Sequence, residues 1–363
     1  MGGGSTVEKS GEHRQYMSLQ AGRGLAALLI VVQHASTFAG VVPGLWVHPE
    51  ISRWLMGMKL GVAFFFVLSG IVILTAHWED VGRPDRVRRY AWKRFRRIYP
   101  IYWVVLIPVV ASQLVLGTQP ERSNPWVVMS SVVLVRIRSG YETNLVVAWT
   151  LFIEVLFYAL FALALVNRKL GAAVLGLWFA MSGLNLMHRP MVAEMLFSPL
   201  HLLFAMGMAV AWWMRRRKTA RPGVLLASGG AVLLTGLIYG GWRGSASCWV
   251  YLWAGVGTAM ALLGAVELER RGRMGVPGWL RFLGDASYSI YLVHFPVIAA
   301  LARVCHRMDA RLHLPIVVWL AVMVACGTGA GCLLHVFVER PLIRGRRPRT
   351  VVRRYAVGVP ATA

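Results

Sequence analysis

Acidic residues are scarce in this sequence, and charged residues of either sign are uncommon. Of 363 residues only 15 are Asp or Glu, against 39 Lys or Arg, and charged residues make up 15% of the chain whereas hydrophobic residues make up 57%. Soluble domains carry about 25% charged residues. The composition therefore excludes an ordinary soluble protein, and it leaves a formal net charge of +24 to be explained.

Cysteine is also rare, and no secretory leader is visible. Cys248, Cys305, Cys326 and Cys332 lie in or beside apolar segments, without the spacing of metal ligands. We therefore expect no metal site and buried free thiols, with a Cys248–Cys305 bridge as the alternative. Residues 1–18 are polar and glycine-rich and contain no apolar core before a cleavage site, so we expect no signal peptide.

What the sequence has in abundance is apolar runs that approach or exceed the roughly 18 residues needed to cross a bilayer. These runs predict an all-α, polytopic integral membrane bundle of ten transmembrane helices. The expected spans are 24–42, 58–77, 98–116, 147–166, 170–187, 198–214, 223–240, 248–266, 284–304 and 315–338. A further apolar stretch at 126–137 is too short to cross, and we expect it to be an interfacial or re-entrant piece.

Basic residues set the expected orientation, because Lys and Arg in short loops favour the cytoplasmic side. With both termini in the cytoplasm, residues 78–97 alone hold eight basic residues, as many as all the expected outer segments together. The run at 215–218 is another such orientation signal. The expected domains are a polar cytoplasmic N-terminus (1–18), a membrane domain (19–342) and a basic cytoplasmic tail (343–363).

Two ionisable residues lie in the first expected span. Arg23 and His34 are eleven residues apart, which is about 16 Å along a helix and roughly three whole turns, so both should project from one face. Ionisable residues inside a membrane are costly and usually mark a site or an ion path. The alternative is a basic anchor and a histidine satisfied by a neighbouring helix. We interpret His201 and His335 as packing residues.

Charged residues recur in two later segments. Arg94 and Arg97 are spaced i, i+3, so they share a helix face and suit a polyphosphate, although the same run could anchor on anionic lipid headgroups. Glu154 lies in an apolar helix with Tyr158 one turn along the same face. Its alternative role is that of a protonated carboxyl group bonded to a neighbouring helix.

A polar stripe marks the ninth expected span. Ser287, Tyr291 and His294 fall at i, i+4 and i+7 on an otherwise apolar helix. In the ten-span arrangement His34 and His294 lie about 16 Å from the inner surface, and Glu154 lies roughly 20 Å from it. Two histidines and a carboxylate are therefore expected in one layer near the midplane, which favours a common site.

At this point the residues resemble a known family. The Arg-x10-His opening, FFFVLSG, RFRRIYP, WTLFIEVLFY, SYSIYLVHFP and VERP occur in order and at suitable separations from about residue 19 to 342. This set is similar to membrane acyltransferase family 3, the bacterial O-acyltransferases. Gln20 stands where many members have Asp, which resembles the branch that decorates exopolysaccharides.

The resemblance implies transfer of an acyl group, commonly acetyl, from cytoplasmic acyl-CoA to a sugar hydroxyl of a lipid-linked or exported polysaccharide. The expected location is the bacterial cytoplasmic (inner) membrane. Acyl-CoA would be a co-substrate and not a bound cofactor. The expected partners are the glycan acceptor and membrane lipids, and no nucleic acid is expected. A sugar hydroxyl needs a base near neutral pH, and histidine is suited to that task.

On this reading His34 is the general base, and Glu154 orients it or shares its proton. The substrate pocket would be lined by Tyr291, His294 and Tyr158. The phosphates of CoA would be held by Arg23, Arg94 and Arg97. No serine or cysteine stands beside His34 in the sequence, which favours direct transfer over an acyl-enzyme.

Two other classes are compatible with some of these features. A proton-coupled transporter also needs ionisable residues at midplane, but such proteins usually contain internal repeats or paired broken helices, and this sequence has no such repeat. A membrane glycosyltransferase that uses lipid-linked sugars should have acidic residues in its first outer loop, where residues 43–57 offer only Glu50.

Overall fold

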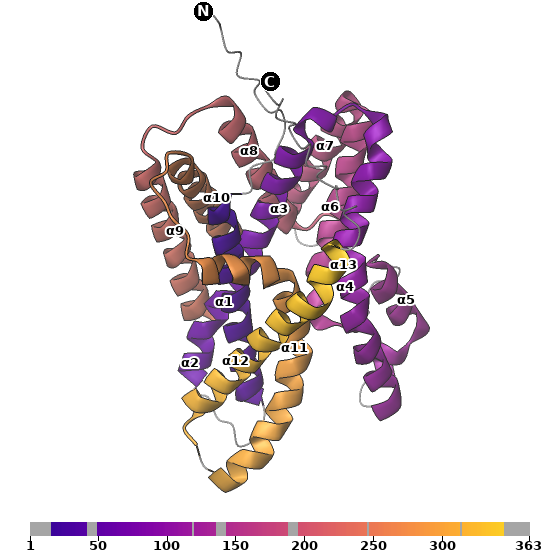
Figure 1. Cartoon of the computed structure of the whole chain (residues 1–363), viewed down its shortest axis with the longest axis vertical. Coiled ribbons are helices and arrows are strands. Elements are labelled where there is room, and N and C mark those ends of the chain that lie inside the picture. The colour runs from indigo at the N-terminus through magenta and orange to yellow at the C-terminus, as the bar shows by residue number, and fades with distance from the viewer. Residues whose placement is uncertain are drawn as a thin grey trace, which may run out of the picture.

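In the computed structural model, residues 16–41, 49–117, 120–135, 143–187, 195–244, 247–312 and 314–344 are described, and within these ranges the chain forms helices and no strand (Figure 1). The predicted all-α polytopic bundle is therefore confirmed. The expected N-terminal region up to residue 15 and the expected tail from residue 345 lie outside the described residues.

Ten long helices follow the predicted spans in order. They are α1 (Met17–Val41), α3 (Gly61–His77), α4 (Val87–Leu116), α6 (Trp149–Val166), α7 (Arg168–Met187), α8 (Leu202–Arg216), α9 (Pro222–Arg243), α10 (Cys248–Arg270), α11 (Gly278–Leu312) and α12 (Ile316–Leu334). Eight helical segments of the described chain are long and apolar enough to cross a membrane. The two that fall short of this standard are α8, with only 15 residues, and α1, so the count of ten crossings stays a prediction.

Shorter helices connect these elements. They are α2 (Pro49–Leu55), α5 (Pro125–Val133), α13 (Arg340–Arg344), the π-helix η7 (His335–Glu339) and the 3-10 turns η1 (Met56–Leu60), η2 (Trp78–Asp80), η3 (Pro84–Arg86), η4 (Pro120–Ser123), η5 (Val146–Ala148) and η6 (Pro199–His201). Figure 1 shows α4 to α7 on one side of the bundle and α9 on the other, with α1, α3 and α11 between them.

The apolar stretch at 126–137 forms the nine-residue helix α5, which is too short to cross, as predicted. Aromatic side chains of α4 hold its last carbonyl groups: Tyr102 donates to Ser131 O at 2.8 Å and Trp103 donates to Val132 O at 3.0 Å. Carbonyls at a helix end lack partners within the helix, so these bonds fix α5 beside α4.

All four cysteines are free, so the alternative of a Cys248–Cys305 bridge is not realised. Cys305 is buried as expected, whereas Cys326 is exposed on the helix surface, which corrects the expectation that every thiol is buried.

Glycines allow two close helix crossings that shape the interior. A Cβ atom on Gly70 would lie 2.3 Å from the carbonyl oxygen of Phe204, and one on Gly207 would lie 1.9 Å from that of Val67. Helices α3 and α8 therefore pack through their backbones, as small residues permit in membrane proteins.

The second crossing joins α1 to α11, helices from opposite ends of the chain. A Cβ atom on Gly284 would lie 2.0 Å from the carbonyl oxygen of Gln20, and one on Gly24 would lie 3.0 Å from the amide nitrogen of Gly284. No side chain larger than hydrogen fits at Gly284 without moving α1 away from α11.

We predict that Gly284→Ala lowers the thermal stability of the purified protein, because its methyl group would meet the backbone of α1, and overpacking of this kind costs about 1–3 kcal/mol. The Tm in detergent measures the effect. Gly278→Ala is the control, since it makes the same change in the same helix where an added Cβ has no neighbour within 4 Å. Equal Tm values for the two variants would contradict the close crossing.

Candidate active site

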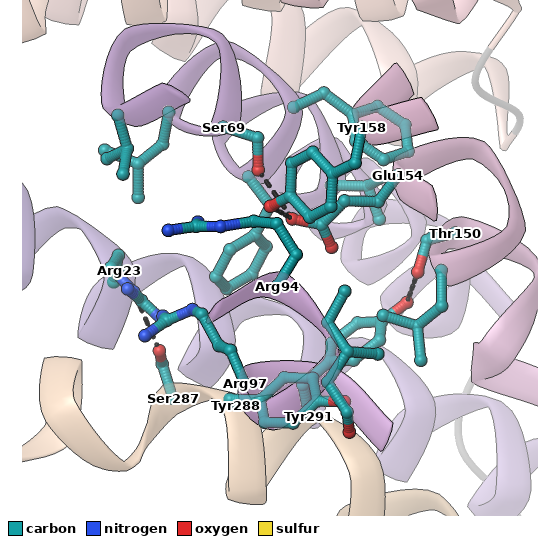
Figure 2. A pocket seen from close by; sticks show the side chains of 17 residues that line it. Arg23, Ser69, Arg94, Arg97, Thr150, Glu154, Tyr158, Ser287, Tyr288 and Tyr291 are labelled. Atoms are coloured by element: carbon teal, nitrogen blue, oxygen red, sulfur yellow. Dashed lines mark hydrogen bonds between the residues drawn. The ribbon is translucent and has the colours of Figure 1, made fainter. Parts of the chain in front are cut away.

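A cavity lies among helices α1, α3, α4, α6 and α11 (Figure 2). Its polar lining consists of Arg23, Ser69, Arg94, Arg97, Thr150, Glu154, Tyr158, Ser287, Tyr288 and Tyr291. Six of the residues selected from the sequence are in this lining, whereas the two histidines, His34 and His294, are not. The remaining wall is mainly apolar, which limits access of water to the polar groups.

Glu154 lies on the cavity wall with two hydroxyl donors. Ser69 of α3 donates to Oε1 of Glu154 at 2.8 Å, and Tyr158 donates to the same oxygen from the next turn of α6. The guanidinium carbon of Arg94 lies 5.7 Å from the centre of the Tyr158 ring. The carboxylate, the phenol and this arginine thus form one connected group (Figure 2).

Three arginines give the cavity a positive charge. Nε of Arg23 donates to Oγ of Ser287 at 3.1 Å, and Figure 2 shows Arg97 beside this pair. The buried Nε of Arg94 has no hydrogen-bond partner in the described part of the chain. Like charges repel strongly in a partly buried site, and a single lining carboxylate, Glu154, offsets them only in part. The cavity is therefore suited to an anionic ligand.

The two histidines form a pair between α1 and α11. Nδ1 of His34 lies 3.1 Å from Nε2 of His294 and 3.1 Å from the carbonyl oxygen of Ile30, and Nδ1 of His294 lies 2.9 Å from the carbonyl oxygen of Ile290. A carbonyl oxygen only accepts, so each Nδ1 carries a proton. With neutral rings, Nε2 of His294 accepts from His34, and Nε2 of His34 keeps a free lone pair.

Tyr291 stands between the histidine pair and the cavity. Its ring centre lies 5.9 Å from that of His294 and 5.9 Å from that of Phe65, and both Tyr291 and Phe65 line the cavity. Its hydroxyl donates to Val147 O at 3.0 Å and lies 2.7 Å from Oγ1 of Thr150. The wall formed by Phe65 and Tyr291 therefore separates the histidine pair from the arginines.

One expected contact is wrong. Glu154 was expected to orient His34, but the side chain bonded to His34 is that of His294, and Glu154 bonds to Ser69 and Tyr158. His294 was expected to line the substrate pocket, yet it is fully buried behind Tyr291. The position of a residue along its helix does not specify which neighbouring helix its side chain faces.

Some polar groups near the site were not singled out as site residues. Ser69 and Thr150 were not among the candidate site residues. His335 was interpreted as packing, but its Nδ1 lies 2.7 Å from Oε2 of buried Glu339, to which Ser289 also donates at 2.7 Å. The i, i+4 spacing of His335 and Glu339 was a signal that could have revealed this pair.

Within the described residues, no group of three or more His, Cys, Asp or Glu side chains is arranged to hold a metal ion. The arrangement offers an anion-binding cavity, a carboxylate and a histidine with a free lone pair, all within a helical membrane bundle.

Comparison with known proteins shows the family to which this chain belongs. Residues 17–335 match the acyltransferase domain model of acyltransferase family 3, and the chain therefore belongs to this family. It is a multi-pass membrane O-acyltransferase, which sets aside the transporter and glycosyltransferase alternatives.

The chain is also similar to one named protein over most of its length. The chain is 31% identical over 311 residues to the exopolysaccharide production protein ExoZ of Rhizobium meliloti (strain 1021), a match that covers 80% of this chain and 91% of the relative. No solved structure gives a significant match.

We predict that His34→Gln and His34→Ala both reduce turnover by roughly 10²–10⁴-fold, the usual contribution of a positioned base, with a normal yield of inserted protein. Gln can donate to Ile30 O and His294, but it has no lone pair that accepts a proton near pH 7. Acyltransfer rate and yield are measured together.

His201→Gln is the matched control, because His201 is fully buried and its Nε2 lies 2.9 Å from the carbonyl oxygen of Met195, a bond that Gln can replace. A fully active His34→Gln variant would show that His34 only packs against its neighbours and that another residue is the general base.

Proposed function

We propose that this protein transfers an acetyl group from cytoplasmic acetyl-CoA to a sugar hydroxyl of a lipid-linked or exported polysaccharide, in the bacterial cytoplasmic membrane. The observation that carries the proposal is a positively charged cavity inside the membrane bundle, separated by one aromatic wall from a histidine with a free lone pair. Family membership supplies the reaction class, and the name of the relative from R. meliloti supports a polysaccharide acceptor.

The proposal that acetyl-CoA is the donor is based on the three arginines of the cavity. Arg94 and Arg97 project from one face of α4 into the cavity and Arg23 projects into it from α1. The planar guanidinium group binds phosphate oxygens through two parallel hydrogen bonds, so arginine suits the diphosphate of CoA. The thioester would then extend past these arginines toward Glu154 and Tyr291.

In the proposed reaction, His34 activates the hydroxyl group of the acceptor sugar. Its Nε2 takes the proton of the sugar hydroxyl as the oxygen attacks the thioester carbonyl, so that a C–O bond forms and the C–S bond breaks. The sulfur leaves as a thiolate, which takes up the proton that Nε2 of His34 received, so that the neutral imidazole is regenerated. Ile30, His294 and Phe295 contact His34, and none of these three carries a hydroxyl or thiol group that could take the acyl chain from the donor, which supports direct transfer.

Glu154 has a different role in this proposal from the one expected from the sequence. Its carboxylate holds Ser69 and Tyr158 and offsets part of the arginine charge, so it positions the donor side of the cavity. Holding the reactants in place while excluding water accounts for much of the rate in reactions of this type.

We predict that neutralising Arg94 and Arg97 together (R94Q/R97Q) raises the KM for acetyl-CoA and leaves the KM for the acceptor nearly unchanged. Each charge-assisted phosphate contact contributes about 1.5–3 kcal/mol, so at least a tenfold change is expected. R88Q/R89Q is the control, because it removes two exposed charges from the same helix that do not line the cavity. An unchanged donor KM in R94Q/R97Q would leave these arginines only an anchoring role.

The acceptor class is tested by mass spectrometry of surface glycans from cells with and without this protein. We expect O-acetyl groups on a polysaccharide to disappear when the protein is absent and to return with the wild type but not with His34→Gln. Glycans that are identical in all three strains would exclude a polysaccharide acceptor.

A further inference from the structure

Lys59 is a lysine inside the second expected span, and the reaction described above does not use it. It lies in η1 (Met56–Leu60), a 3-10 segment within the stretch Ile51–Asp80, which is long and apolar enough to cross a membrane. Ionisable residues and irregular backbone at membrane depth usually mark a functional site. The other lysines of the chain are all expected on the cytoplasmic side, at Lys9, Lys93, Lys169 and Lys218.

The segment η1 packs against α1 close to the proposed base. The side-chain nitrogen of Gln33 donates to Sδ of Met56 at 3.5 Å, and a Cβ atom on Gly61 would lie 3.1 Å from Cγ1 of Ile30. Gln33 and Ile30 are the residues one position and one helical turn before the base. Lys59 lies between these two contacts along the chain, so it is held beside the same part of α1.

The positive charge of Lys59 has no counter-ion in the described part of the chain. Its ammonium group makes no hydrogen bond and no ion pair there, and its side chain is partly exposed. The charge acts on the imidazole of His34. When His34 takes the acceptor proton it becomes a cation, and two neighbouring cations repel each other. An anion bound to Lys59 would remove this repulsion at the step where it matters.

Aromatic side chains lie beside His34 toward the expected outer end of α1. The ring centre of Phe295 is 5.2 Å from that of His34 and 5.0 Å from that of Phe38, which follows His34 by one turn. Both phenylalanines are partly exposed, and neither they nor Lys59 line the arginine cavity. Ligand sites typically combine aromatic surfaces with a few charged groups that fix orientation. These side chains therefore suit a sugar that carries a negative charge.

We propose that the acceptor is an anionic glycan, whose charged group pairs with Lys59 while its sugar ring packs against Phe38 and Phe295. We call these three side chains the acceptor subsite. A carboxylate on the sugar and a phosphate that joins the first sugar to a lipid both have the required charge. This inference rests on the proposed function, because it takes His34 as the base, and it adds the charge of the acceptor and the residue that recognises it.

Binding of amphiphilic sugars to the full chain in nanodiscs tests the subsite without acyl transfer. The ¹⁵N signals of His34, assigned by their loss in His34→Gln, report whether a probe lies beside the base. Octyl β-D-glucuronide carries a carboxylate, glucosyl farnesyl phosphate carries a phosphate, and octyl β-D-glucoside is uncharged. We expect an anionic probe to shift the His34 signals at about a tenfold lower concentration than the glucoside. A response to only one of the two anionic probes identifies the source of the charge.

Three variants test the role of Lys59 in this binding. Lys59→Gln should remove the advantage of the anionic probes, whereas Lys59→Arg should keep it, because arginine retains the positive charge. Lys169→Gln is the matched control, since it makes the same change at an exposed lysine at the start of α7. An unchanged preference in Lys59→Gln, or no response of His34 to either anionic probe in the wild type, would overturn the proposal.

Transfer assays separate this inference from the proposed function. For the anionic sugar that binds, Lys59→Gln should raise the acceptor KM about tenfold and leave the KM for octyl β-D-glucoside unchanged. An equal loss of rate with charged and uncharged sugars would overturn the recognition role while the proposed function stands. Probe binding that depends on Lys59, together with surface glycans that carry the same O-acetyl groups with and without this protein, would uphold the subsite and overturn the proposed function.

Discussion

The contact between α1 and α11 is the constraint on which the site depends. At Gly284 the two backbones approach so closely that a methyl group does not fit, and at Gly24 an added Cβ would lie only 3.0 Å from the backbone of α11. Two polar contacts cross the same interface, from Arg23 to Ser287 and from His34 to His294. Because the first lines the cavity and the second lies behind its aromatic wall, one helix crossing sets the position of the base relative to the anion-binding groups.

The membrane makes this arrangement more restrictive than it would be in water. Polar groups among apolar helices must find partners within the protein, since lipid offers none. Glu154 is held by Ser69 and Tyr158, and each imidazole Nδ1 faces a carbonyl oxygen one turn earlier in its own helix. These local bonds fix the protonation pattern of the histidine pair, so the helix backbone itself decides which nitrogen of His34 is free.

Much of the helical architecture followed from the sequence, because the length of an apolar run is a strong signal. The ten long helices occur where apolar runs predicted them, and α5 is short because its apolar run is short. The expected common face of Arg23 and His34 is also consistent with the structure, since both side chains contact α11.

The neighbours of each site residue could not be predicted in the same way. Glu154 was placed beside the wrong partner, because hydropathy and helical spacing do not determine how helices are rotated against each other. Ser69 and Thr150 were missed as site residues for a related reason: single hydroxyl groups are common in membrane helices, and only their contacts with Glu154 and Tyr291 distinguish them.

The central claim is that His34 presents an unprotonated Nε2 because its Nδ1 donates to Ile30 O and His294. The direct measurement is the ¹⁵N spectrum of histidine-labelled protein in lipid, with the His34 signals assigned by their loss in His34→Gln. At a pH at which the enzyme is active, the account predicts a protonated Nδ1 and a bare Nε2 in His34. A protonated Nε2 under those conditions would contradict it, because that nitrogen could not accept the proton of the sugar hydroxyl.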